Sequence, residues 1–479
     1  MGKKYYRFRT LEKLLDPKFN ELENQIIYFS PPEALNDPQE GYRDIYWKGD
    51  SIVWKNLFKN YISSLESMAF LWNLMGSKER LDLDKIDVFR TLIDYPTPQY
   101  MDIIKAIWQR IFSNPSIELL IEHVSNRNTP IRKMELDAYL SMLHPYALQM
   151  IFEEYKSRNL TSFEPNFFEG GDKDVFKDDW FNLFGELNNE ESKINIESFF
   201  QARKAMSDEF KLYAIASHEE PSEEEEEKYN AIQNKISMNF NFPEAYIKKL
   251  EDLSYPKWYT ACFMTENENA SVWGHYGDNH TGVCLIYEGD SEDKINFELN
   301  YSYSSQTGHM KKMIPMEMKE INYDDNADRA IDFFKSIGRL PEFKLNEYWY
   351  RDEDGRVSPI AEEVGSKEWR DNYWSQFYRD ITIKNEDWAY ENEYRAVLSS
   401  VFFDYSQVES RCVKYDFKQL KGLIFGVRTP VLDKVKIIKK IKMLCEKYER
   451  EDFKFYQAYY SSKTNKIIHL EINVFKTLD

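Results

Sequence analysis

The strongest constraint on the fold is the distance along the chain between its strand-like segments. Residues 4–9 alternate aromatic and basic side chains, and residues 25–30 form a second short apolar run. Two strands of this length cannot form a stable sheet alone. The next strand-rich part begins at about residue 255. The N-terminal strands must therefore pair with strands that follow about 200 residues later, which makes the intervening part an insertion.

The intervening part has the pattern of a helical domain. Glycine is sparse there, and long amphipathic stretches such as 53–75 and 197–218 predict helices. After residue 255 the predicted strands are joined by short connections, which favours antiparallel pairing. We therefore predict an α+β fold with a mostly antiparallel sheet in residues 1–48 and 255–479, and an all-helical insertion in residues 49–254.

Composition limits the class of partner and the compartment. The 63 basic and 82 acidic residues give a net charge of −19, which disfavours broad binding to nucleic acid or anionic lipid but leaves a local basic surface possible. No stretch approaches the roughly 20 apolar residues of a membrane span. The start "MGKKYYRFRT" is too polar for a signal peptide. We expect a cytoplasmic protein without a membrane segment.

The cysteines support the same compartment. Cys262, Cys284, Cys412 and Cys445 are scattered, and no pair has the spacing of a zinc or redox motif. Few, unclustered cysteines are typical of a reducing compartment. The chain also lacks the P-loop, dinucleotide-fold, zinc-protease and nucleophile-elbow motifs. We expect no metal site.

The segment "YRFR" near the N-terminus is a candidate anion site. On a strand, Arg7 and Arg9 share one face. Guanidinium groups match the oxygens of a diphosphate in pairs, so the two arginines could hold one. An exposed strand face with ordinary salt bridges remains an equally simple explanation.

The segment "YFSPPEALNDPQEG" predicts a rigid loop. Asn36 and Asp37 favour a turn because their side chains bond the local backbone, and the following proline fixes its own φ angle. The functional interpretation is a loop that presents Asn36 and Asp37 to a ligand, with Ser30 at the end of the preceding strand. Turn geometry alone also explains the motif.

The segment "SVWGHYGDNH" predicts a short helix that begins at Ser271. Trp273, Tyr276 and His280 lie roughly along one side of it. His275 and His280 are five residues apart and do not share a helix face, which argues against a metal site. His275 and Tyr276 are candidate ligand contacts, and roles in the core or at the helix end stay open.

The segment "WAYENEYRAV" carries the main catalytic candidates. As a strand over 388–397 it would place its aromatic side chains on one face and Glu391, Glu393 and Arg395 on the other. Two neighbouring carboxylates repel, so one pKa should rise unless a cation such as Arg395 compensates. A helical alternative would pair Glu391 with Arg395 at i, i+4.

These motifs in order resemble a known family. "YRFR", "IYFSPPEALNDPQEG", "WGHYGDNHTGVCLIYE", "WAYENEYRAV" and "LKGLIFGVR" are similar to the pattern of the bacterial domain of unknown function family 2971, over roughly residues 1–48 and 255–475. That pattern in turn resembles, more distantly, the split-sheet plan of ADP-ribosyltransferases. The Ser-Thr-Ser motif of some such enzymes is absent here.

The resemblance implies a set of roles around NAD as substrate. Glu393 would stabilise the positive charge that develops on the ribose, and Glu391 would accept the proton of the incoming nucleophile. Arg9, or else Arg7, would anchor the diphosphate. The resemblance matches Tyr28 to Ser30 to the second motif of the plan, and Tyr28 or Tyr276 could stack on the nicotinamide. The other candidate ligand contacts, Asn36, Asp37 and His275, come from the segments described above.

The resulting expectation is a NAD-consuming ADP-ribosyltransferase or NAD glycohydrolase, active in bacterial stress or phage defence. Its acceptor would be a protein or a nucleic acid. One alternative is a metal-dependent nuclease that binds Mg²⁺ through Asp37, Glu391 and Glu393, with Lys384 nearby. Another is a non-enzymatic sensor or interaction module, since aromatic residues and the helical part suit partner binding.

Overall fold

The computed structural model describes residues 2–91, 94–164, 166–167, 183, 185–186, 195–216, 226–304 and 308–473. The chain divides into two compact units. Unit 1 comprises Met1–Tyr42, Pro256–Asp328 and Gln376–Asp479, and unit 2 comprises Arg43–Tyr255 and Arg329–Ser375. The sequence groups 329–375 with the α+β domain, whereas in the structure they join unit 2. A reason is that β11 (Ala330–Asp332) pairs with β3 (Asp44–Trp47).

Unit 1 is built on an eight-stranded sheet whose order is β17-β16-β15-β6-β1-β5-β13-β9. All its neighbours are antiparallel except the parallel pair β15 and β16. In chain order its strands are β1 (Lys4–Arg9), β5 (Trp258–Met264), β6 (Val283–Glu288), β9 (Lys319–Glu320), β13 (Glu393–Ser399), β15 (Leu420–Phe425), β16 (Lys454–Ser461) and β17 (Lys466–Ile472). The fold is therefore α+β with a mostly antiparallel sheet.

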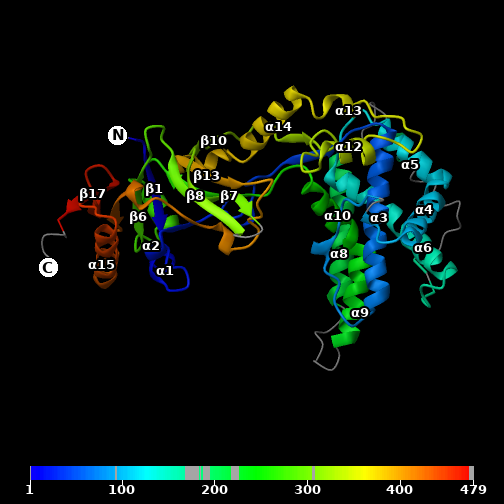
Figure 1. The fold of residues 1–479 in the computed structure, drawn as a ribbon, viewed down its shortest axis with the longest axis horizontal. Coiled ribbons are helices and arrows are strands. Elements are labelled where there is room, and N and C mark those ends of the chain that lie inside the picture. Colours follow the sequence, from blue (N-terminus) through cyan, green and yellow to red (C-terminus); the bar gives the residue numbers. More distant parts are fainter. Residues whose placement is uncertain are drawn as a thin grey trace. The chain divides into compact units, whose positions relative to one another are not determined.

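The first strand lies in the middle of this sheet, between β5 and β6, and Figure 1 labels β1 in blue close to β6 in green. Its partners follow the helical part of the chain. β1 pairs with β6 along its whole length, from Lys4 opposite Glu288 to Arg9 opposite Val283. The short second strand, β2 (Ile26–Tyr28), pairs with β14 (Cys412–Lys414) outside the main sheet.

The two faces of the sheet bury different cores. Tyr5 and Leu285 belong to the larger core, which also takes Ile437 and Ile441 from the helix α15 (Val431–Lys447). We call this side face A. Phe8 belongs to the smaller core, which is closed by the helix α11 (Ala270–Tyr276), and we call that side face B. Alternation along the strands decides which residues reach each face.

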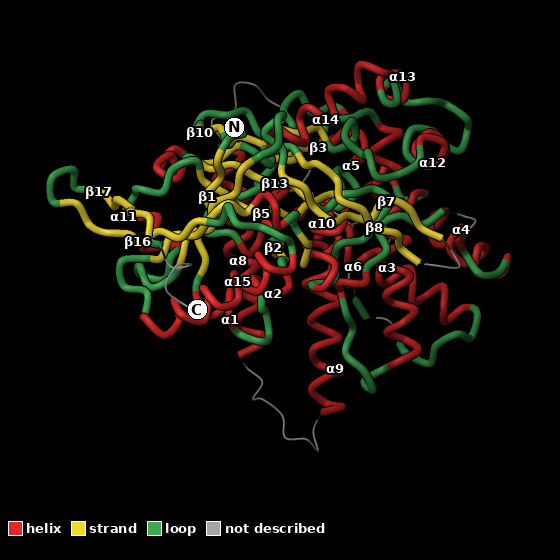
Figure 2. The backbone as a smooth tube through the Cα atoms, turned by 60° about the vertical axis from the view of Figure 1, so that its left-hand side comes forward, coloured by secondary structure: helices red, strands yellow, loops and turns green. Residues whose placement is uncertain are grey.

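The remaining elements of unit 1 surround these faces. The sequence predicts one helix over residues 11–22, but the chain forms two short helices because Asp16 and Pro17 interrupt the pattern. A two-stranded arm, formed by β7 and β8, and several short segments complete the unit; Figure 2 labels both strands of the arm. They are α1 (Leu11–Leu15), α2 (Glu21–Asn24), η1 (Pro32–Ala34), β7 (Ile295–Ser304), β8 (Gly308–Met316), β10 (Asn322–Tyr323), β12 (Ile383–Lys384), η6 (Glu386–Glu391), η7 (Glu409–Arg411) and η8 (Phe417–Gln419).

Unit 2 is mainly helical. Its long helices α3 and α6 bury aromatic and aliphatic side chains, and Tyr61 of α3 bonds His144 of α6 at 2.6 Å. The described helices and strands include α3 (Ser51–Met75), η2 (Leu83–Lys85), α4 (Pro98–Phe112), α5 (Pro115–Ser125), β4 (Ile131–Arg132), α6 (Lys133–Ser157), α8 (Ile196–Ala216), α9 (Glu226–Ile236), η5 (Ser237–Asn241), α10 (Phe242–Glu251), α12 (Glu342–Tyr348) and α13 (Ile360–Glu363); α14 (Lys367–Asp380) extends into unit 1. Across the described residues, every helix falls short of the length and apolar character that a membrane crossing requires.

Candidate functional site

Five charged side chains from four segments meet on face B of unit 1. We call them the charged cluster. Each of their side chains is at most 4% exposed, although charged residues are almost never buried unless they are paired. The members are Glu40 from the loop after η1, Lys384 of β12, Glu391 at the end of η6, and Glu393 and Arg395 of β13.

Lys384 and Arg395 bridge the three carboxylates. Lys384 Nζ donates to Glu391 Oε2 at 2.8 Å and to Glu393 Oε2 at 3.0 Å. Arg395 Nε donates to Glu393 Oε1 at 2.7 Å, and Arg395 Nη2 donates to Glu40 Oε1 at 2.7 Å. The remaining guanidinium nitrogen bonds the carbonyl of Ile381 at 2.9 Å. Glu393 is thus held on both oxygens.

A left-handed residue brings the two acids to the same lysine. The expected strand over 388–397 is wrong in its first half, because residues up to Glu391 form the 3₁₀ helix η6 and β13 begins only at Glu393. Asn392 joins them with φ 46°, a conformation that Asn tolerates better than most residues. Glu391 and Glu393 therefore approach Lys384 from a helix end and a strand, and not as neighbours on one strand face.

The cluster separates the pKa values of the two acids. Burial raises the pKa of Glu391 above its usual value, and the nearby Lys384 offsets this only in part. Burial would also raise the pKa of Glu393, but Arg395 and then Lys384 lower it to about 2. Burial opposes the charge of Lys384, yet Glu393 and Glu391 outweigh it and raise the pKa of that ammonium. Glu393 is a fixed anion, whereas Glu391 is the carboxyl group of the cluster that takes up a proton more readily than a free carboxyl.

One negative charge in the cluster is not compensated. Three carboxylates against two cations leave a net charge of −1 when all are ionised. Glu40 Oε2 is buried without a hydrogen-bond partner. A buried charge network of this kind is costly compared with apolar packing, which makes it a candidate for function as well as for structure.

A hydrogen-bond chain connects the cluster with the surface. The half-buried Tyr276 of α11 donates from its hydroxyl to Glu391 Oε1 at 2.6 Å. The exposed Asn36 donates from Nδ2 to the Tyr276 hydroxyl at 3.1 Å. Burial and the Glu391 charge raise the pKa of Tyr276, so its hydroxyl keeps its proton. Three predicted segments therefore meet here, at Asn36, Tyr276 and Glu391.

The exposed His275 lies at the edge of this region. Its Nδ1 is 3.2 Å from the hydroxyl of Tyr390, which belongs to η6. Trp388, on the same 3₁₀ helix, places its ring 4.8 Å from Lys384 Nζ. The backbone N–H of Glu393 donates to the Tyr323 hydroxyl at 2.8 Å, and burial raises the pKa of that tyrosine to about 12. Aromatic rings thus surround the acids.

The first-strand arginines do not join the cluster. Tyr6 is opposite Met264, and Met264 is opposite Glu393, so these three side chains share face B. Arg7 and Arg9 alternate with Tyr6 and lie on face A. Arg7 donates to the carbonyls of Cys262 at 3.0 Å and Tyr28 at 3.3 Å, and Arg9 is paired with Glu21. The expected meeting of these arginines with Glu393 is therefore wrong.

The surroundings of Arg7 suit a structural role. Its side chain is buried, and burial followed by the neighbouring Arg9 lowers its pKa to about 10. The Arg9 fork is occupied by both oxygens of Glu21. Both guanidinium groups form contacts within the fold on face A, although Arg7 Nε has no hydrogen-bond partner, and neither group is placed to bind the diphosphate of a ligand on face B.

Other predicted ligand contacts, from the segment "YFSPPEALNDPQEG", form hydrogen bonds that stabilise the local fold. The carbonyl of Tyr28 accepts from Arg7, and Ser30 forms a backbone bridge with Thr260. The buried Asp37 accepts the backbone N–H of Gln39 at 2.8 Å, as its turn predicts. Of the predicted ligand contacts in this segment, Asn36 reaches the hydrogen-bond chain, and Glu40 of the same segment joins the charged cluster.

Two cluster members had little or no signal in the sequence. Glu40 ends the predicted turn, and nothing in its spacing distinguishes it from a surface acid. Lys384 stands close to Glu391 and Glu393 along the chain, which was its only indication. In the described part of the chain, no group of three or more His, Cys, Asp and Glu side chains is arranged to hold a metal ion.

Comparison with known proteins adds one finding to this geometry. The chain has no match among curated proteins and none among solved structures. A family model matches residues 272–396, a range that holds Tyr276 and four of the five cluster residues, Lys384, Glu391, Glu393 and Arg395. The matching family is described as Protein of unknown function (DUF2971), and its model covers residues 272–396 of this chain.

Proposed function

We propose that unit 1 is a NAD-consuming enzyme of the ADP-ribosyltransferase or NAD glycohydrolase type, with Glu391 as its acting carboxylate. The observation that carries the proposal is the net-negative buried cluster, linked to the surface through Tyr276 and Asn36. A bacterial stress or phage-defence setting, and a protein or nucleic-acid acceptor, are parts of the same proposal.

The chemistry explains why such a cluster suits this reaction. When the bond between ribose C1′ and nicotinamide breaks, nicotinamide leaves with the bonding electrons and positive charge develops on the sugar. A preorganised negative site stabilises that charge. The acceptor forms the new bond to C1′, and its proton passes to the Glu391 carboxylate and then to solvent. Water as acceptor gives the glycohydrolase reaction.

Glu391 keeps the proton-accepting role that the resemblance implies, whereas Glu393 takes a different role from the implied one. Glu393 is neutralised by Arg395 and Lys384, and its side chain is 1% exposed. It is therefore assigned as a positioning residue that fixes Lys384. Glu391 has the raised pKa and the link to the surface, which suits proton exchange.

The fit to NAD is partial. The anionic cluster with its aromatic neighbours Tyr276 and Tyr390 suits the cationic nicotinamide and ribose. The diphosphate lacks the anchor that the resemblance implies, because Arg7 and Arg9 lie on face A and are engaged there. Binding of NAD is accordingly tested before turnover.

Glu391→Gln should abolish turnover while leaving the fold intact. Isothermal calorimetry measures NAD binding, and labelled NAD with protein, nucleic-acid and water acceptors measures transfer. We expect a loss of about 10²–10⁴-fold, the range for a general base. Glu386→Gln on the same 3₁₀ helix, where Glu386 is exposed, is the matched control and should keep full activity. No NAD binding, together with no transfer to any acceptor, would overturn the proposal.

Tyr276→Phe should shift the pH profile of that activity. The Tyr276 hydroxyl bonds Glu391 and lowers the pKa of that carboxyl, while burial raises it. Without this bond the Glu391 pKa rises further, so the acid limb of kcat/KM moves to higher pH. An unchanged acid limb would contradict a role for Glu391 as the ionised base.

A non-enzymatic interaction module is the second candidate. The observation that favours it is that Arg7, Arg9, Glu393 and Arg395 each form hydrogen bonds within the fold. Under this alternative, Glu391→Gln leaves the cellular phenotype intact. The metal-dependent nuclease is less supported, since Lys384 already occupies the position between Glu391 and Glu393.

A further inference from the structure

The exposed side of α15 is rich in lysine. This helix carries six lysines against Asp433 and Glu446, a net charge of +4 in a chain of net charge −19. Its apolar residues Ile437, Ile441 and Leu444 are buried in the core of face A. With about 100° per residue, Lys439 falls opposite this buried side, and four lysines including it lie outside the buried stripe. We call them the lysine face: Lys436, Lys439, Lys440 and Lys447.

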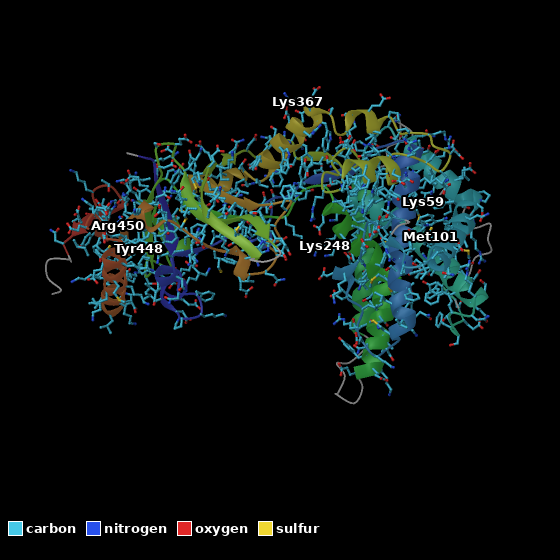
Figure 3. The ribbon with its side chains drawn as sticks, viewed as in Figure 1. Lys59, Met101, Lys248, Lys367, Tyr448 and Arg450 are labelled. Atoms are coloured by element: carbon cyan, nitrogen blue, oxygen red, sulfur yellow. The ribbon has the colours of Figure 1, made fainter. Side chains whose placement is uncertain are left out.

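The fold neutralises this face only in part. Lys436 pairs with Asp433 at 2.8 Å on its own helix, and Lys440 pairs with Glu23 of α2. Within the described part of the chain, Lys439 and Lys447 form no ion pair, although the ammonium of Lys447 lies 5.3 Å from the ring of Tyr448. The exposed Glu446 is the acid nearest to Lys447 on the helix. Figure 3 labels Tyr448 and Arg450 just beyond this end of α15.

The spacing of the lysines opposes the stability of the free helix. Lys436 is three and four residues from Lys439 and Lys440, and Lys439 is three residues from Lys442. Like charges at these spacings face each other and destabilise a helix by about 0.2–0.5 kcal/mol per pair. An anionic partner that lies along the helix would remove this repulsion.

The residues of the lysine face favour a nucleic acid over an anionic bilayer as its partner. A helix that enters a bilayer inserts a continuous apolar side, but the apolar side of α15 is buried against the sheet. The exposed side of α15 carries three large apolar residues, and two of them, Val431 and Leu432, stand at its first turn, with Met443 farther along. Lysines spaced along a rigid helix match the regular phosphates of a nucleic acid. Lys436 to Lys447 span about 16 Å at 1.5 Å per residue.

We infer that the lysine face of α15 binds the phosphate backbone of a nucleic acid. The contacts are sequence-independent, because lysines that reach phosphates carry no base readout. The net acidity of the rest of the chain confines the binding to this face. The inference is independent of the proposed function, since the charged cluster lies on face B and α15 covers face A.

Fluorescence anisotropy with a short labelled DNA duplex of random sequence, and with its single strand, tests the inference on the full chain. We expect wild-type binding that weakens from about 50 to 200 mM salt with a slope near −0.9 per phosphate contact. The K436Q/K439Q/K447Q variant should bind at least about tenfold more weakly, because three phosphate contacts lose their charge. Glutamine keeps the helix propensity of lysine.

The matched control removes the same charge elsewhere. Lys248, Lys257 and Lys367 are exposed, and Figure 3 labels the first and last of them. K248Q/K257Q/K367Q should bind as the wild type does, and circular dichroism should show equal helix content in both variants. Equal binding by both triple variants would overturn the inference. So would absence of binding at low salt, or binding to phosphatidylserine vesicles without binding to either oligonucleotide.

Discussion

Replacing Arg395 with methionine should lower the free energy of unfolding of unit 1 by about 3–5 kcal/mol, the usual cost of removing one partner of a buried ion pair. The Arg395 side chain is 0% exposed, and its guanidinium group bonds Glu393, Glu40 and the carbonyl of Ile381. Methionine fills a similar volume without charge. The three buried carboxylates would then share only Lys384, so the cluster would hold a net charge of −2.

Urea unfolding followed by near-ultraviolet circular dichroism measures this loss. Lys454→Met is the control in the same sheet, because Lys454 pairs with Glu471 while about half of each side chain is exposed. It should change stability by less than about 1 kcal/mol. Glu393→Met combined with Arg395→Met should recover part of the loss, since the pair is removed together. An Arg395→Met loss no larger than that of Lys454→Met would show that the cluster does not hold the fold.

Glu393→Gln should remove the loss of stability that Glu393 contributes as the pH falls below 4.5. The Glu393 pKa is lowered from 4.5 to about 2, so its contribution is fully present above pH 4.5 and is lost as the pH falls through about 2. A shift of this size corresponds to about 3 kcal/mol. At neutral pH the free energy of unfolding of the variant should be lower than that of the wild type by about that amount. Near pH 2 the difference between the two proteins should largely disappear.

Glu391 changes the free energy of unfolding over a different pH range, and its effect has the opposite sign to that of Glu393. Its pKa is raised in the folded state, so the folded protein binds this proton more readily, and stability from this group increases as the pH falls toward 4.5. Urea midpoints at neutral pH, near pH 4.5 and near pH 2 separate the two groups. A Glu393→Gln variant that loses as much stability as the wild type between pH 4.5 and 2 would contradict the assignment of Glu393 as the fixed anion.

Local features of the site could be predicted from the sequence, whereas the set of residues that form the charged cluster could not. The turn at Asn36 and Asp37 and the short helix that carries Tyr276 follow from side chains that act within a few residues. The strand with Glu393 and Arg395 on one face was also predictable, but its start was not. The strand pattern extended back to Trp388, and only the left-handed Asn392 shows where the 3₁₀ helix ends.

The sequence by itself determined the fold class: short N-terminal strands required partners beyond a long helical part, and β1 lies between β5 and β6. Periodicity also placed Arg7 and Arg9 together on one face of β1. Only the tertiary structure decided that this face is opposite to Glu393, because pairing register across β5 sets which faces coincide. It also decided that Glu40 and Lys384 complete the charged cluster. Residues so far apart along the chain meet through long-range packing, on which no local pattern depends.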